Sequence, residues 1–158
     1  IGDSYFAYVA AFGCYSDIAY KAKREKKQRF GKASYYSLAA KRALKRAKYA
    51  VRYAVDGKSV VKIVPFLMVM NGSDIGGFKV NKNGSTDDGM MELFLPKVAP
   101  FNGLVQTLVN PKSEVIKVSS VDIRPLDSLP WCLDGEIGPS GAVTVSVLTK
   151  KVKVFSSK

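Results

Sequence analysis

Hydrophobic and polar positions alternate over several short stretches of this chain, and the alternation predicts mainly β structure. Between Lys48 and Val55, aromatic and aliphatic residues occupy every second position, which is the period of a half-buried strand. Asp56-Gly57 follows and favours the positive φ angles of a tight hairpin turn. The next apolar run contains Pro65, which we expect at a bulge or a sheet edge. Strands are predicted at residues 5–11, 48–55, 60–70, 78–80, 90–95, 115–121, 131–133, 142–148 and 152–155.

Three other stretches favour helices. Residues 17–29 are charged and predict a helix or an ordered loop, and residues 101–109 predict a short helix. A further helix is expected to begin at Ser34, a suitable N-cap, because Leu38 and Leu44 then lie on one face. Short strands punctuated by Gly and Pro predict an antiparallel β sandwich with attached helices, a mainly β member of the α+β class.

Length and composition narrow the classes of protein. The 158 residues predict a single domain over 1–158, and no apolar run approaches the ~20 residues that cross a bilayer. The chain begins at Ile1 without Met, so we interpret it as an excised fragment. Its two cysteines, Cys14 and Cys132, are far apart, which favours a reduced, cytoplasmic setting. Histidine is absent from the sequence, which excludes Ser-His-Asp and Cys-His nucleophiles.

Positive charge is concentrated in one segment. The net charge is +12, and residues 21–52 contain thirteen basic residues and one acid, whereas the remainder is balanced at twelve of each. Such a block is typical of a solvated helix face or of a surface for a polyanion. Both alternatives stay open, and the polyanion is either an anionic membrane or a nucleic acid.

Two acidic clusters are candidates for chemistry. The first spans residues 85–90 and the second residues 130–136. Carboxylates beside hydroxyl and backbone oxygens are the ligands that magnesium prefers. A carboxylate near Trp131 could have a raised pKa and act as a general base. The alternatives are ordinary Asp-Gly turns and a Trp131 that is simply core. In the loop 71–78, the paired Gly76 and Gly77 predict a close backbone approach to a ligand or to another chain segment, or else a glycine bulge.

In this order, five motifs resemble the C-terminal half of bacterial soluble diacylglycerol kinases. They extend over nearly the whole chain, and their specificity comes from their number and order. The motifs are Tyr8-Val9-Ala10-Ala11-Phe12-Gly13, Gly31-Lys32-Ala33-Ser34-Tyr35-Tyr36, Asn71 with Ile75-Gly76-Gly77-Phe78-Lys79, Asp87-Asp88-Gly89-Met90-Met91-Glu92-Leu93, and Pro130-Trp131 with Leu133-Asp134-Gly135-Glu136.

The resemblance implies the C-terminal β-sandwich domain of a two-domain kinase that transfers the γ-phosphate of ATP to a lipid hydroxyl. The family's Gly-Gly-Asp-Gly-Thr phosphate loop does not occur in this chain, so the domain that binds ATP is expected elsewhere. Carried over by motif, the Mg²⁺ ligands are Ser85, Asp88 and Met90, the last through its carbonyl. The proton acceptor is Glu136, with Asp134 able to share or replace that role. Family members often have Asp where this chain has Glu92, which leaves that position without an assigned role.

The sequence leaves open the lipid substrate, the binding partner and the oligomeric state. The substrate is diacylglycerol or a related lipid, including sphingoid bases and polyprenols, which present a similar hydroxyl. We expect the basic segment Lys21 to Arg52 to hold a cytoplasmic protein peripherally at an anionic membrane. The rival is a non-catalytic β-rich module that binds nucleic acid, which we disfavour because few aromatic residues accompany the basic ones. A homodimer is left open.

Overall fold

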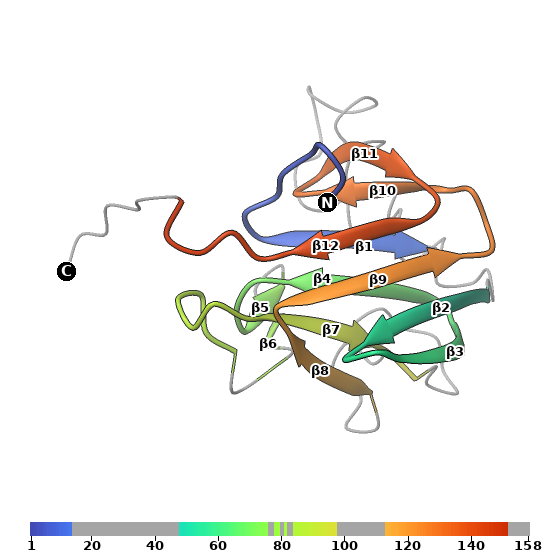
Figure 1. The fold of residues 1–158 in the computed structure, drawn as a ribbon, viewed down its shortest axis with the longest axis horizontal. Helices are drawn as coiled ribbons and strands as arrows, with labels where there is room; N and C mark the ends of the chain where they lie inside the picture. Colours follow the sequence, from blue (N-terminus) through green and yellow to red (C-terminus); the bar gives the residue numbers. More distant parts are fainter. Residues whose placement is uncertain (14–47, 76–77, 80, 82–83, 98–112, 152–158) are drawn as a thin grey trace, which may run out of the picture.

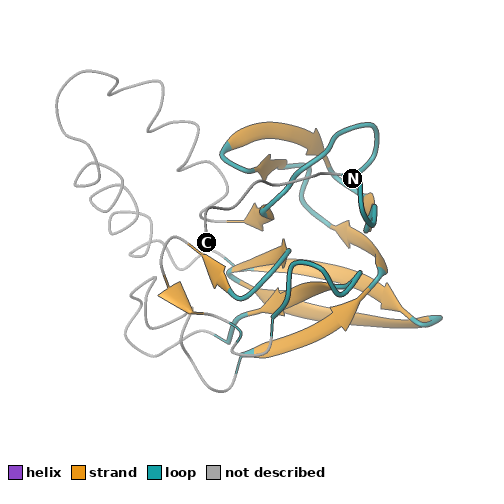
Figure 2. Ribbon diagram, turned by 90° about the vertical axis from the view of Figure 1, so that its left-hand side faces the viewer, coloured by secondary structure: helices purple, strands orange, loops and turns teal. Residues whose placement is uncertain are grey.

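A computed structural model describes residues 1–13, 48–75, 78–79, 81, 84–97 and 113–151. Its regular structure in these residues consists of β-strands joined by turns, as Figure 2 shows. The strands pair antiparallel throughout and form two main sheets and a two-stranded ribbon. The predicted antiparallel β sandwich is therefore confirmed. The helices predicted at 17–29, from Ser34 and at 101–109, and the strand at 152–155, lie outside the described residues.

The larger sheet has six strands in the order β11-β10-β1-β4-β7-β8 (Figure 1). It combines the N-terminal strand with strands from the middle and the end of the chain. Its members are β1 (Val9–Gly13), β4 (Phe66–Met70), β7 (Met91–Leu95), β8 (Glu114–Val118), β10 (Pro130–Leu133) and β11 (Glu136–Ser140).

The smaller sheet has four strands in the order β12-β9-β2-β3. Its β2–β3 hairpin closes at Asp56 and Gly57, whose φ angles of 49° and 74° confirm the predicted turn. The ribbon of β5 (Asp74–Ile75) and β6 (Phe78–Lys79) stands apart from both sheets in the pairing. The four-stranded sheet contains β2 (Tyr49–Val55), β3 (Lys58–Val64), β9 (Ser120–Pro125) and β12 (Val143–Ser146).

The two sheets share one hydrophobic core. Alternate residues of each strand point inward, so Phe12 and Leu93 of the larger sheet belong to the same buried cluster as Val51 and Ile123 of the smaller one. Trp131 is fully buried, lies 5.4 Å from Phe12 between ring centroids, and donates its indole N–H to the Gly141 carbonyl at 3.0 Å. The reading of Trp131 as a core residue is therefore confirmed.

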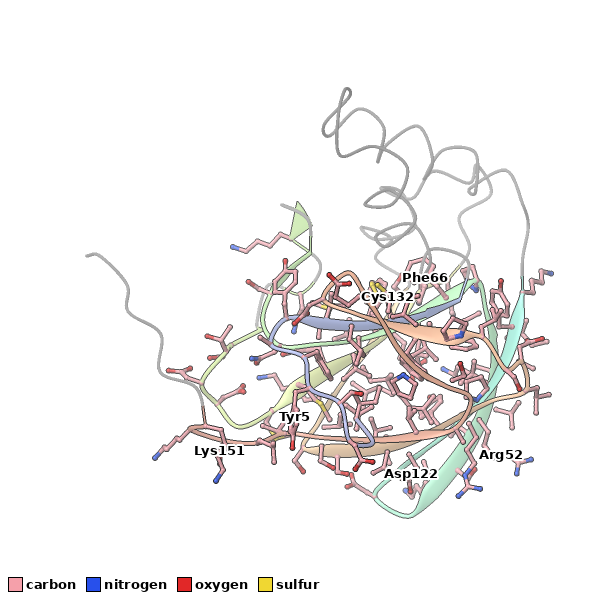
Figure 3. The ribbon with its side chains drawn as sticks, turned by 90° about the horizontal axis from the view of Figure 1, so that it is seen from above. Tyr5, Arg52, Phe66, Asp122, Cys132 and Lys151 are labelled. Carbon is pink, nitrogen blue, oxygen red and sulfur yellow. The ribbon has the colours of Figure 1, made fainter. Side chains whose placement is uncertain are left out.

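The opposite face of the six-stranded sheet is buried as well. Phe66, Met68, Met70 and Phe94 form a second apolar cluster there, and every residue of β4 and β7 is buried. Burial on both faces explains why these strands are continuous hydrophobic runs in the sequence rather than alternating ones. Figure 3 places Phe66 on one side of the sandwich and Arg52 on the other.

Two of the predicted strands are each divided between the sheets. The predicted strand 60–70 ends at Val64 in β3 and restarts at Phe66 in β4, because Pro65 cannot continue the ladder and the chain crosses to the other sheet. The predicted strand 115–121 likewise becomes β8 and β9 around Ser119. The prediction of two unbroken strands was wrong. Strand β11 was not predicted.

Candidate functional site

The second acidic motif forms a tight hairpin turn at one end of the six-stranded sheet. Asp134 and Gly135 have φ angles of 47° and 94°, and Leu133 pairs with Glu136 across the turn. Two consecutive positive φ angles define the turn type that Asp-Gly favours. Asp134 therefore lies at the tip, and Glu136 begins β11.

The carboxylate of Asp134 holds the segment that enters β1. It accepts hydrogen bonds from the backbone N–H groups of Ala7 at 2.6 Å, Tyr8 at 3.1 Å and Val9 at 2.7 Å. The backbone N–H of Asp134 donates in return to the Val9 carbonyl at 2.9 Å. Both carboxylate oxygens have donors, so Asp134 has a structural task that the sequence did not indicate.

Asn71 holds the same segment from the other side. Its backbone N–H donates to the Tyr8 carbonyl at 2.9 Å, and its side-chain amide donates to the Ala7 carbonyl at 3.3 Å. Asn71 follows β4 directly, and Asp134 follows β10 directly. The backbone of residues 7–9 therefore connects two motifs that are 63 positions apart in the sequence.

Glu136 lies at the start of β11, beyond the turn that Asp134 occupies. Its side chain is exposed, as is that of Asp134, while Trp131 and Leu133 turn into the core. Glu136 pairs directly with Leu133 across the turn, so these two side chains start from the same face of the hairpin. The role of either carboxylate as a general base stays a prediction.

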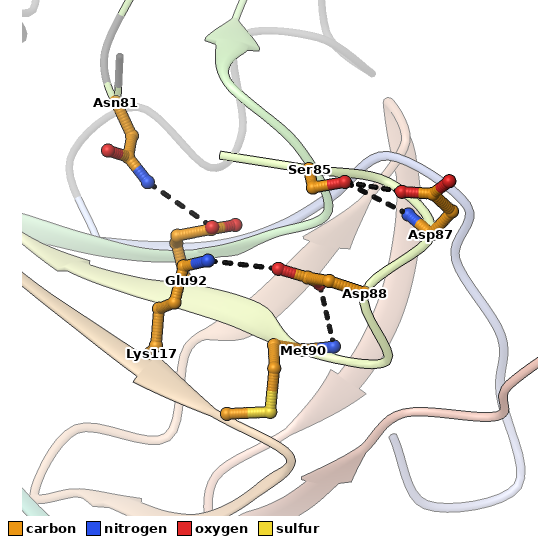
Figure 4. Close-up of polar contacts among 7 residues, drawn as sticks. All are labelled: Asn81, Ser85, Asp87, Asp88, Met90, Glu92 and Lys117. Atoms are coloured by element: carbon orange, nitrogen blue, oxygen red, sulfur yellow. Dashed lines mark hydrogen bonds and ion pairs between the residues drawn. The ribbon is translucent and has the colours of Figure 1, made fainter. Parts of the chain in front are cut away.

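The first acidic motif is a turn whose side chains bond one another, as Figure 4 shows. Ser85 and Asp87 lie 2.5 Å apart between Oγ and Oδ1. Asp88 accepts the backbone N–H of Met90 on Oδ1 at 3.0 Å, and its Oδ2 lies 2.9 Å from the ammonium of Lys117. The hydrogen bond from Lys117 is the main reason that the pKa of Asp88 is lowered, followed by the bond from Met90.

Glu92 is a fully buried carboxylic side chain on the outer face of the six-stranded sheet. Its Oε1 accepts the side-chain amide of Asn81 at 3.2 Å, and its Oε2 makes no hydrogen bond with any described residue. Burial raises the pKa of Glu92, while the backbone amide of Gly72 and the charge of Lys117 lower it by less. An unsatisfied buried oxygen of this kind calls for a partner.

The approach of Asn81 to Glu92 depends on a close contact between two glycines. A Cβ placed on Gly84 would lie 2.5 Å from the carbonyl oxygen of Gly72, so only glycine fits there. Asn81 also donates its backbone N–H to the Ser73 carbonyl at 3.1 Å. The close backbone approach predicted from the paired glycines Gly76 and Gly77 stays a prediction, because both lie outside the described residues. The contact between Gly72 and Gly84 was not predicted.

Strand order brings the two acidic motifs to the same end of the sheet. Val9 pairs with Met70, Met70 with Glu92, and Glu92 with Lys117 in one continuous row. Asp134 bonds to the Val9 end of that row. Three strand spacings of about 4.8 Å separate β10 from β7, so the backbones of the two motifs are roughly 14 Å apart. This separation, spanned by β1 and β4, prevents direct contact between the two motifs.

The first motif offers suitable chemistry for a hard cation. A serine hydroxyl, an aspartate carboxylate and a backbone carbonyl are all oxygen ligands of the type that Mg²⁺ binds. Among the described residues, no group of three or more Asp, Glu, Cys or His side chains gathers as a metal cluster. Ser85, Asp88 and Met90 would offer Mg²⁺ one carboxylate, whose Oδ2 lies beside the ammonium of Lys117 in this structure.

Sequence reasoning missed two residues of this site. Asn81 and Lys117 carry no motif, and they reach Glu92 and Asp88 only through the loop and the β7–β8 register. The alternation of β8 could have indicated that Lys117 shares a face with Val115, but nothing local indicated which carboxylate it would meet.

The comparisons with known proteins agree with this architecture. No family model matches the chain. Over 98% of its length it is 26% identical to a protein named diacylglycerol kinase from Staphylococcus carnosus, of which it covers 54%. Two solved structures of candidate diacylglycerol kinases from Bacillus anthracis match 89% of the chain, with TM-scores of 0.63 and 0.60 at 19% and 21% identity.

The β-sandwich fold is thus shared with the matching half of these solved structures. The resemblance to bacterial diacylglycerol kinases, first inferred from five short motifs, is confirmed by the alignment of nearly the whole chain with part of a protein of that name. The chain spans about half the length of the relatives that it matches. Within the described residues, no helix has the length and apolar character needed to cross a bilayer.

Proposed function

We propose that this chain is the lipid-binding half of an ATP-dependent lipid kinase, in which Glu136 accepts the proton of the lipid hydroxyl. The observation that carries the proposal is the placement of both acidic motifs at one end of the six-stranded sheet, joined by residues 7–9 and by the row from Val9 to Lys117. A kinase needs a base and a cation site near one substrate, and it needs no histidine.

Glu136 is the better candidate for the base. Asp134 uses both carboxylate oxygens to hold three backbone N–H groups, and its removal would displace the entry to β1. Glu136 lies two residues further on an exposed strand start. Substitution of Glu136 therefore leaves the three hydrogen bonds of Asp134 in place.

Ser85, Asp88 and Met90 would hold Mg²⁺ on the far side of the same sheet end. When bound there, the cation would neutralise negative charge near the phosphates of ATP. The nucleotide itself would be bound mainly by a second domain, in keeping with the half-length match to the kinases. Asn81 and Glu92 would hold the loop that supplies these ligands.

The lipid would be presented from an anionic membrane. Most of the basic segment Lys21 to Arg52 lies outside the described residues, but Arg52 is exposed on β2. It stands opposite Arg124 on β9 and opposite Val61 on β3, which is 57% exposed. Two neighbouring arginines beside an exposed apolar side chain are suited to the interface of an anionic bilayer.

A kinase assay on the full-length protein tests the proposal. Glu136→Gln preserves the shape of the side chain and removes its capacity to take a proton, so kcat should fall roughly 10²- to 10⁴-fold with little change in the KM for ATP. Asp134→Asn is the comparison, and it should lower stability as well as rate. If Glu136→Gln turns over normally and Asp134→Asn is inactive although folded, the base is Asp134. Normal turnover in both variants refutes a general base in this domain.

A further inference from the structure

Lys117 and Glu92 are cross-strand neighbours that do not bond each other. They pair directly between β7 and β8, and such side chains start about 5 Å apart on the same face. The ammonium of Lys117 instead lies 2.9 Å from Asp88 Oδ2. Glu92 Oε2 stays without a hydrogen bond to any described residue, although the side chain is fully buried. The lysine therefore has two carboxylates within reach and uses one.

The same lysine stands in the way of a cation at the first acidic motif. Asp88 Oδ1 is engaged by the backbone N–H of Met90, and Oδ2 is the oxygen that Lys117 holds. A divalent cation on Oδ2 would meet the positive charge of the ammonium at hydrogen-bonding distance. Lys117 must therefore leave Asp88 before Oδ2 can act as a ligand. The acceptor it could move to is Glu92 Oε2, on the adjacent strand.

We propose that Lys117 is a counter-ion with two positions, on Asp88 when the turn holds no cation and on Glu92 when Mg²⁺ binds the turn. The exchange sets the affinity of the turn for Mg²⁺ and couples cation binding to β7 and β8. It gives a use to a buried carboxylate oxygen that has no partner among the described residues. The inference rests on the Mg²⁺ site of the proposed function, but it requires neither ATP nor lipid.

Calorimetric titration of MgCl₂ into the full-length protein, without nucleotide or lipid, tests the exchange. Lys117→Met removes the competitor, so Mg²⁺ should bind roughly two- to fivefold tighter, which is the range expected for a partly exposed ion pair. Glu92→Gln keeps an acceptor for Asn81 but removes the acceptor for Lys117, so Mg²⁺ should bind weaker by a similar factor. Lys62→Met is the matched control, because Lys62 forms a similarly exposed ion pair with Glu114 on other strands, and it should leave the affinity unchanged.

The double variant Glu92→Gln/Lys117→Met distinguishes an exchange of Lys117 between two carboxylates from independent electrostatic effects of the two residues on Mg²⁺. Under exchange, Glu92→Gln should weaken Mg²⁺ binding at least twofold more in the wild type than in the Lys117→Met background. Equal factors in the two backgrounds would overturn the proposal, as would Mg²⁺ binding that Asp88→Asn leaves unchanged. A protein that shows the coupling but does not phosphorylate lipid would sustain the exchange and refute the proposed function.

A second measurement does not depend on a variant of the buried Glu92. In protein labelled with ¹⁵N-lysine, Mg²⁺ should shift the side-chain ammonium signal of Lys117 and not that of Lys62. A Lys117 signal that stays in place while calorimetry reports Mg²⁺ binding at Asp88 contradicts the exchange.

Discussion

Asp134 and Val9 bond each other twice, once from the Val9 N–H to the Asp134 carboxylate at 2.7 Å and once from the Asp134 N–H to the Val9 carbonyl at 2.9 Å. The pair joins a hairpin turn near the end of the chain to the first strand. It gives the second acidic motif a fixed place beside the row of residues that ends at Lys117. Stability and chemistry can therefore be separated experimentally at this motif.

Asp134→Ala should destabilise the fold strongly. The change removes the acceptor of three backbone N–H groups, and hydrogen bonds to a charged group contribute about 1.5–3 kcal/mol. We expect the free energy of unfolding to fall by ~2 kcal/mol or more, measured from urea denaturation. Asp56→Ala is the matched control, because Asp56 occupies the same position of the β2–β3 hairpin turn with a φ of 49°. Equal losses in the two variants would mean that only the turn conformation matters.

Asp88→Asn in the full-length protein should weaken the cation site rather than the chemical step. The amide is a poorer ligand for Mg²⁺ than the carboxylate and no longer attracts Lys117. Raising Mg²⁺ should restore most of the lost kinase activity, whereas Glu136→Gln should stay inactive at every Mg²⁺ concentration. A loss in Asp88→Asn that high Mg²⁺ leaves untouched would argue against a cation at this turn.

Because of Glu92, the free energy of unfolding should fall as pH rises above the ordinary pKa of a glutamate side chain. Burial raises the pKa of Glu92 above 4.5, so the folded state holds a proton that the unfolded state releases. Its contribution is fully present below pH 4.5 and is lost as pH rises through the folded-state pKa. Urea denaturation across this range should show a smaller decline for Glu92→Gln than for the wild type.

The contribution of Asp88 to stability changes with pH in the opposite direction to that of Glu92, and at lower pH. Its pKa is lowered below 3.8 by Lys117 and Met90, so its contribution is present above that value and is lost only as pH falls further. Measurements above pH 4.5 therefore separate the effect of Glu92 from that of Asp88. Parallel curves for the wild type and Glu92→Gln in that range would show that the buried carboxylate is not protonated in the folded state.

Binding to anionic vesicles should depend on the basic segment and on salt. Reversing the charges of Lys41, Arg42, Lys45 and Arg46 should abolish most co-sedimentation of the full-length protein with phosphatidylglycerol vesicles, and added salt should weaken the wild type, since the Debye length shortens to about 8 Å at physiological ionic strength. Reversal at Lys58 and Lys150, which are described and exposed, is the control. Unchanged co-sedimentation after reversal of the four charges would return the segment to a solvated helix face.

The sequence by itself determined the local geometry and the class of fold. Alternation between Lys48 and Val55 and the Asp56-Gly57 pair predicted the β2–β3 hairpin, because side-chain direction in a strand and positive φ in a turn are properties of adjacent residues. The same local rules gave the antiparallel sandwich. Two acidic motifs were recognisable as turns for the same reason.

Only the tertiary structure decided which strands are neighbours and what each carboxylate does. Pro65 and Ser119 send the chain from one sheet to the other, although the apolar pattern continues through both. Strand order brings Asp134 to the backbone of residues 7–9, more than a hundred positions away, and Lys117 to Asp88, 29 positions away. Strand order is set by the burial of both faces of the larger sheet, and that burial depends on the whole chain rather than on any local run of residues.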